Sequence, residues 1–226
     1  MKLVLTCEHG GNITPEDFKT YFEGQEAVLN SHRGYDLGAL DLFQFLKPLA
    51  DYALYSETSR LFIELNRSLH HPELFSEFTK SLSKAEKEQL IDTYYLPYRT
   101  AVENTIMNWV NQNETVLHIS IHSFTPNLNG IERHCDIGLL FDSCRNSEKA
   151  FCKFFKEDIL RKAPNLKVRY NYPYLGKADG FTTHLRKQSQ NNYLGIELEI
   201  NQKHAVNNAF PDELKLALFS ALKSVL

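Results

Sequence analysis

Hydrophobic and polar residues alternate along the chain with two different periods, which predict strands and helices in turn. Residues 115–122 (TVLHISIH) have the period of two typical of a strand, with Leu117, Ile119 and Ile121 on one face and polar side chains on the other. Residues 36–49 instead carry apolar side chains at helical spacing. By the same criteria we expect further strands over residues 2–7, 60–65, 136–141, 166–170 and 193–200, and further helices over residues 83–111, 148–161 and 211–226. Pro97 lies inside the longest of these helical segments, where we expect a break or a kink.

The alternation of strands and helices favours the α/β class, as a single domain over residues 1–226 with a mixed, largely parallel sheet flanked by helices. The 226 residues are a normal length for one domain, and no repeat or linker divides them. Hydrophobic residues make up 42% of the chain, which is enough to build a core and excludes a disordered protein.

Charge and cysteine content narrow the protein class further. The formal net charge of −3 shows no basic excess, so we expect no nucleic-acid partner. No stretch approaches the roughly 18 apolar residues of a membrane span, and the first apolar run is too short for a signal peptide. The four cysteines form no CxxC pair, which favours a reduced, cytoplasmic protein.

Polar side chains gather where the predicted strands end. His9 follows the first strand, Asn66 and Arg67 follow the second, and His122 ends the third. Glu199 lies near the end of the last strand, where a carboxylate among apolar residues is costly to bury unless it is paired or used. In open α/β sheets, ligands bind at the carboxyl ends of the strands. The sequence therefore predicts a functional site at this edge of the sheet.

Two histidines together with carboxylates are suited to a catalytic zinc site, which needs three nitrogen or oxygen ligands and an open position for water. Zinc lowers the pKa of that water toward about 7, and a nearby carboxylate can take its proton. Spacing alone leaves alternatives open, because His118 shares a face with His122 and Glu197 shares a face with Glu199. A single histidine is also more often a hydrogen-bonding residue than a ligand. The residues by themselves thus indicate a metal-dependent hydrolase without fixing its ligands.

Seven segments spread over nearly the whole chain match one known family. They are CEHGGN (7–12), HRGYDLGAL (32–40), SRLFIELNRS (59–68), HISIHSFTP (118–126), DIGLLFD (136–142), NYPYLGKADGFTTHLR (171–186) and GIELEINQ (195–202). In this order they resemble the N-formylglutamate amidohydrolase family. The resemblance implies a phosphorylase/hydrolase-like fold of the zinc carboxypeptidase and aspartoacylase type, with a mixed eight-stranded sheet.

The resemblance also implies a zinc site. His9 and His122 match the positions of the histidine ligands. Related carboxypeptidases carry a glutamate three residues after the first histidine, but this chain has Asn12 there. Asp36, in the HRGYD segment, is then the expected third ligand, and Glu8 is the alternative.

Catalytic and substrate-binding roles follow from the same resemblance. Glu199 matches the family's glutamate on the last strand and is expected to be the general base. Asn66 and Arg67 resemble the pair that holds a substrate carboxylate, a task that suits the bidentate guanidinium. Arg60 and Arg186 are candidates for a second cation: Arg60 as a catalytic group on the oxyanion, and Arg186 as a substrate-binding residue.

The function implied is zinc-dependent hydrolysis of an N-acyl amino acid, first of all N-formyl-L-glutamate to formate and L-glutamate. We expect one zinc ion per chain, although a site of histidine and carboxylate also accepts other divalent metals. The expected partner is the small-molecule N-acyl amino acid, with neither nucleic acid nor membrane. Two alternatives remain: a zinc amidase or carboxypeptidase-like enzyme acting on another N-acyl amino acid or small peptide, and a metal-free binding protein that kept the fold.

Overall fold

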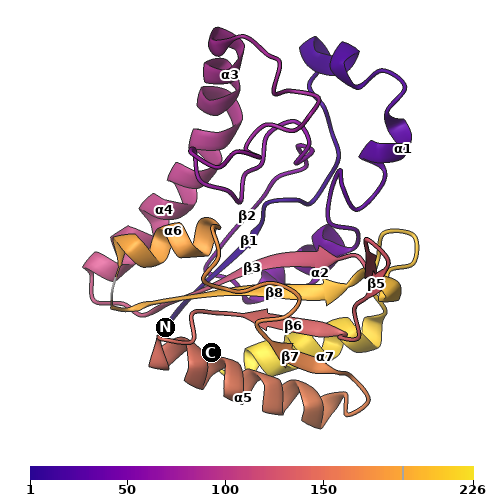
Figure 1. Ribbon diagram of the computed structural model, residues 1–226. Helices are drawn as coiled ribbons and strands as arrows, with labels where there is room; N and C mark the ends of the chain where they lie inside the picture. The colour runs from indigo at the N-terminus through magenta and orange to yellow at the C-terminus, as the bar shows by residue number, and fades with distance from the viewer. Residues whose placement is uncertain (190) are drawn as a thin grey trace.

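A twisted six-stranded sheet forms the centre of the protein in the computed structural model, which describes residues 1–189 and 191–226 (Figure 1). Its strands lie in the order β2-β1-β3-β8-β6-β7, and all neighbours are parallel except β6 and β8. They are β1 (Lys2–Cys7), β2 (Tyr52–Tyr55), β3 (Val116–Phe124), β6 (Ile137–Leu140), β7 (Val168–Tyr170) and β8 (Tyr193–Asn201). A separate antiparallel hairpin consists of β4 (Asn127–Leu128) and β5 (Ile131–Glu132). The predicted class, an α/β domain with a largely parallel sheet, is confirmed.

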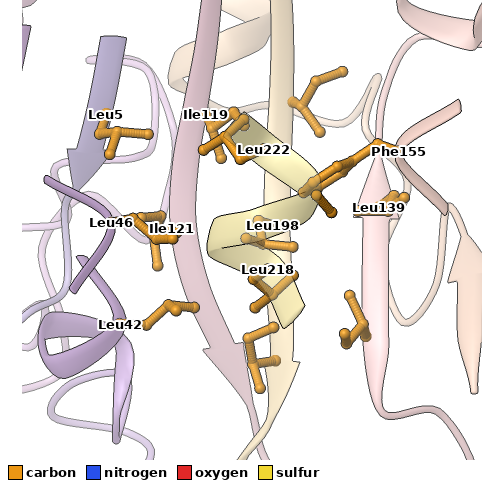
Figure 2. Close-up of a cluster of buried hydrophobic side chains, with 14 of the residues drawn as sticks. Leu5, Leu42, Leu46, Ile119, Ile121, Leu139, Phe155, Leu198, Leu218 and Leu222 are labelled. Atoms are coloured by element: carbon orange, nitrogen blue, oxygen red, sulfur yellow. The ribbon is translucent and has the colours of Figure 1, made fainter. Parts of the chain in front are cut away.

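Helices cover both faces of the sheet, so its central strands are buried on both sides. On one face, α2 (Ala39–Leu46), α5 (Asn146–Lys162) and α7 (Asp212–Lys223) pack over the apolar side of β3 and β8. Figure 2 shows Leu218 and Leu222 of α7 against Ile119 and Leu198 of the sheet. On the opposite face lie α4 (Leu96–Asn111) and α6 (Phe181–Gln188) (Figure 1). Every residue of β3 is buried, including its polar ones, which therefore need partners inside the protein.

The predicted helix over residues 83–111 is present as one continuous helical segment. It consists of α3 (Lys84–Leu90), a π-helical turn over Ile91–Tyr95, and α4. Ser83 and Glu86 form a capping box at its start. Pro97 stands in the first turn of α4, just after the π-helical turn, so the expected interruption takes this form rather than a break.

The strand predicted over residues 60–65 is wrong, because this segment is a series of turns. The backbone N–H of Phe62 donates to the carbonyl of Ser59, just before the segment, in the manner of a turn. One hydrophobic core buries four residues of this segment: Leu61, Phe62, Ile63 and Leu65. The alternating pattern therefore does not mark one buried and one exposed face of a strand. The edge strand that pairs with β1 on the side away from β3 is β2, which the sequence pattern did not reveal. The helix α6 was missed as well.

The eight-stranded sheet implied by the resemblance is also corrected. The described residues form six strands in the main sheet and two in the separate hairpin. None of the helices in residues 1–189 and 191–226 combines the length and the apolar character needed to cross a membrane. A short helix, α1 (Glu26–Leu29), lies in the long connection between β1 and α2.

Candidate active site

The carboxyl ends of the parallel strands β1, β3 and β8 bring three predicted residues to one edge of the sheet. His9 lies two residues beyond β1, while His122 and Glu199 are register partners on β3 and β8. The strands β3 and β8 point the same way in Figure 1, which places their ends side by side. Asp36 joins them from the segment before α2, where its backbone N–H donates to the His9 carbonyl at 2.9 Å.

His9, Asp36 and His122 form a compact, buried group. Asp36 Oδ2 lies 2.9 Å from His122 Nδ1 and 3.4 Å from His9 Nδ1. One ligand atom from each of the three side chains lies within 4.8 Å of the other two. Two imidazole nitrogens and a carboxylate oxygen at such distances are a suitable donor set for a divalent metal with an open coordination position. The structure thus brings together the three residues expected to hold the metal.

The second nitrogen of each imidazole is held by another carboxylate. His9 Nε2 contacts Glu64 Oε1, while His122 Nε2 lies 3.3 Å from Glu8 Oε2 and 2.8 Å from Ser120 Oγ. Metal-bound histidines usually share their other ring nitrogen in this way, which fixes the orientation of the ring. The Nδ1 atoms, which both face Asp36, are therefore the nitrogens placed to bind a metal.

Negative charge predominates around this group. Glu8, Asp36, Glu64 and Glu199 are all buried, and Arg60 is the cation paired with two of them. Burial would raise the pKa of the Asp36 carboxyl, but the adjacent imidazoles and Arg60 outweigh that effect and hold the pKa far below its usual range. Several buried carboxylates around one arginine fit a bound divalent cation, which would balance their charge.

Glu199 stands apart from the other carboxylates. Its Oε2 is the one buried side-chain nitrogen or oxygen atom among the described residues that has no hydrogen-bond partner. Burial raises its pKa to about 7, aided by the charges of Asp36 and Glu197 and opposed by His122. A carboxyl group whose pKa is near 7 and whose oxygen has no hydrogen-bond partner is suited to take up and return a proton.

A cavity of about 110 Å³ lies over these side chains. Loop 171–180 closes part of it through Tyr174, Leu175, Ala178 and Asp179. The other lining residues are His9, Asp36, Arg60, Asn66, Arg67, His122, Ser123, Glu197 and Glu199. A larger groove of about 600 Å³ borders α5 and α7 but is lined by none of these residues. The chemistry-bearing groups therefore converge on the smaller cavity.

Besides Glu199, three of the predicted substrate and catalytic residues line the cavity. Asn66 accepts a hydrogen bond from the Phe181 backbone N–H through Oδ1, at 2.7 Å. Arg67 donates from Nη1 to the Asp179 carbonyl. The guanidinium of Arg60 is bound to the carboxylates of Asp36 and Glu64.

Arg186 does not reach the cavity, so its predicted substrate-binding role is corrected. Only 7% of the residue is exposed. Its Nε donates to Glu148 Oε1 at 2.9 Å, and its Nη2 donates to the Gly195 carbonyl at 2.6 Å. Arg186 instead joins α6, α5 and β8, because Glu148 lies in α5 and Gly195 in β8.

The structure also separates the alternatives that spacing left open. His118 bonds to Thr6 Oγ1 at 2.8 Å and Tyr193 OH at 2.9 Å, deep between the strands and away from the cavity. Glu197 lines the cavity but accepts a hydrogen bond from Thr182 Oγ1. Glu8 faces the far side of the His122 ring rather than the ligand atoms.

Sequence reasoning missed Glu64 as a partner of the site. It lies inside the segment predicted as a strand, residues 60–65, and was given no role in the site. The signal that was available is the pair Arg60 and Glu64, opposite charges four residues apart in an otherwise apolar run. Such charges are rarely buried without pairing.

The fold and these side chains define an α/β protein with a candidate metal centre and a buried carboxyl group with an unbonded oxygen near the ends of its central parallel strands. The family model of the N-formylglutamate amidohydrolases matches residues 1–205, and the chain belongs to this family. It is therefore an amidohydrolase, an enzyme that acts on an amide bond.

Solved structures support the same assignment at the level of the fold. The Atu2144 gene product from Agrobacterium tumefaciens is 25% identical with a TM-score of 0.77, over 99% of this chain and 91% of that one. The N-formylglutamate amidohydrolase from Ralstonia eutropha JMP134 is 17% identical with a TM-score of 0.73, over 100% of this chain and 94% of that one. Among curated protein sequences, none matches the chain.

Proposed function

We propose that the protein is a zinc-dependent amidohydrolase that cleaves N-formyl-L-glutamate to formate and L-glutamate. The observation that carries the proposal is the buried group of His9, Asp36 and His122, next to the unbonded Oε2 of Glu199. Membership of the amidohydrolase family supports the reaction class.

Each residue of the site has a distinct task in this reaction. Zinc, when bound, supplies a Lewis acid that polarises the acyl carbonyl and lowers the pKa of a coordinated water. His9, Asp36 and His122 would hold it through the atoms that face one another. Glu199 takes the proton of the attacking water and returns it to the leaving amine, as its raised pKa and free oxygen permit.

Arg67 and Asn66 are the residues we assign to the amino-acid part of the substrate. Both line the cavity, and the Arg67 guanidinium offers bidentate donors to a carboxylate. Fixing the amino-acid part leaves the acyl carbonyl in one position relative to Glu199. The small cavity favours a short acyl group such as formyl.

A second candidate substrate class is the N-acyl amino acid without a side-chain carboxylate. Arg60 and Arg67 are the arginines that the described residues contribute to the cavity lining, and Arg60 is already bound to Asp36 and Glu64. One arginine is then left for the two carboxylates of N-formyl-L-glutamate. This observation favours a site that binds the α-carboxylate of the substrate more strongly than the substrate's side chain.

The test combines metal analysis of the purified protein with formate release from N-formyl-L-glutamate and N-formyl-L-glutamine, with and without chelator. Bound zinc and chelator-sensitive turnover of the glutamate derivative alone would support the first proposal. Equal turnover of both substrates would support the second. A protein that neither binds zinc nor turns over substrate after zinc is added would instead be a metal-free binding protein.

A further inference from the structure

Four side chains beside the cavity form a closed ring of polar contacts. Arg60 Nη1 donates to Asp36 Oδ1 at 3.1 Å, and Asp36 Oδ2 lies 3.4 Å from His9 Nδ1. The ring continues from His9 Nε2 to Glu64 Oε1. It closes where Glu64 Oε2 accepts hydrogen bonds from Arg60 Nε and Nη2, at 3.0 and 2.6 Å. Two of the three proposed metal ligands thus belong to one cycle.

We propose that Arg60 is a positioning residue of the metal centre and does not bind the substrate. It holds Asp36 directly and sets the orientation of the His9 ring through Glu64. The inference rests on the proposed metal site and assigns Arg60 a different task from the oxyanion role that the sequence suggested.

The donor geometry of Arg60 supports this role. A guanidinium presents its N–H groups in a planar fork, and here Nε, Nη1 and Nη2 all donate to two carboxylates. A lysine ammonium is a point charge on a flexible stem and does not reproduce this planar bridge. The fork is therefore matched to keeping Asp36 and Glu64 at a fixed separation.

Charge gives the second reason. Asp36 and Glu64 are both nearly buried, and the two carboxylates repel each other unless a cation lies between them. Without Arg60 the two carboxylates would move apart, and that movement would displace Asp36, a proposed metal ligand. The same contacts hold Nε2 of His9 and so keep its Nδ1 toward Asp36.

The experiment measures zinc affinity by competition with a chelating dye, starting from chelator-stripped full-length protein. We expect Arg60→Gln and Glu64→Gln each to weaken zinc binding by roughly 10–100-fold, the usual effect of removing a group that orients a ligand. The double variant should be scarcely weaker than the worse single one, because either substitution opens the same ring. At saturating zinc, Arg60→Gln should keep the wild-type KM.

Arg67→Gln is the matched control, since Arg67 lines the same cavity but lies outside the ring. It should keep wild-type zinc affinity and raise KM. If Arg60→Gln does not fold, as judged by its thermal melt, Arg60→Lys and Glu64→Gln provide the same comparison.

Two results would overturn the inference. Wild-type zinc affinity in Arg60→Gln, with a raised KM, would make Arg60 a substrate-binding residue and leave the metal site intact. Failure of the wild-type protein to bind zinc at all would remove both this inference and the metal-dependent part of the proposed function. The wild-type measurement therefore distinguishes the two failures.

Discussion

Each histidine of the site has a role set by what its two ring nitrogens contact. His9 and His122 each have one nitrogen against a buried carboxylate, Glu64 or Glu8, and the other facing Asp36. His118 lies on the same face of β3 as His122, yet both of its nitrogens are used by a hydroxyl from each neighbouring strand. The same side chain is thus a candidate ligand in one position and a structural hydrogen-bonding group in the other.

Glu199→Gln tests the proton-transfer role at the scale of one oxygen atom. The substitution preserves shape but removes the basic carboxylate, so kcat should fall by roughly 10²–10⁴-fold. Zinc content should not change, because Glu199 is outside the group of His9, Asp36 and His122. Formate release and metal analysis on the same preparation provide both readings. Retained turnover would mean that another group is the general base, and Glu197, which also lines the cavity, would be the next candidate.

His118 should make the stability of the protein depend on pH. Burial lowers its pKa to about 4, whereas an unfolded histidine titrates near its usual value of about 6.5. The unfolded chain therefore takes up a proton first as the pH falls. The stabilisation from keeping His118 neutral is complete above about pH 6.5 and is lost progressively toward about pH 4.

Urea unfolding of the wild type and His118→Gln at several pH values measures this effect. The difference in unfolding free energy should narrow by about 1 kcal/mol between about pH 7.5 and about pH 5.5. A constant difference for His118→Gln would contradict the assignment of a neutral buried imidazole.

The limits of the sequence are clearest for individual residues. His9, His122 and Glu199 could be placed because each follows or ends a strand, and parallel strands share an edge. Arg186 could not, since nothing in the order of residues shows that Glu148 on α5 would meet it. Glu64 was hidden by the period-two pattern of a segment that forms turns, where local hydrogen bonds replaced those of a sheet.

At the scale of elements, β6 fixes how closely loop 171–180 approaches the site. Gly138 of β6 is the register partner of Glu199 on β8, and the Tyr172 carbonyl of the loop packs over it. A Cβ at this position would lie 2.1 Å from that carbonyl oxygen and 3.2 Å from the Glu199 Cβ. Because Gly138 has no side chain, the loop has the space it needs to approach the cavity.

Gly138→Ala should destabilise the protein by roughly 1–3 kcal/mol, because the loop or the strand must move to relieve the overlap. It should also lower turnover, since the same loop contributes Tyr174 to the cavity. Gly24→Ala is the matched control: its Cβ meets nothing within 4 Å, and only its φ of +71° is unfavourable. The free energy of unfolding of that variant should fall by about 1 kcal/mol, and its activity should not change. Equal behaviour of the two variants in urea unfolding and formate release would contradict this account.

At the scale of the whole molecule, the site joins segments that are far apart in the sequence. His9 follows β1, Asp36 precedes α2 and His122 lies near the end of β3, so their approach depends on the pairing of β1 with β3 in the sheet. The sequence predicted the fold class and the edge of the sheet that carries the site. It did not reveal β2, because a short strand with little alternation leaves a weak pattern. The expectation of eight strands in the sheet came from the resemblance, not from this pattern.

A metal held by such distant segments should stabilise the whole fold. Zinc that binds the folded chain and not the unfolded one adds about 2.7 kcal/mol when its free concentration is about 100 times Kd. For a chain of this size that corresponds to a rise in Tm of roughly 5–10 °C. Relief of repulsion among the buried carboxylates Glu8, Asp36 and Glu64 is part of the binding free energy that sets this Kd. Calorimetry of chelator-stripped protein with and without added zinc measures it. His122→Ala should abolish the rise in Tm, whereas Arg67→Gln should keep it. A wild-type Tm that does not change with zinc would mean that other groups of the protein neutralise these carboxylates without a metal.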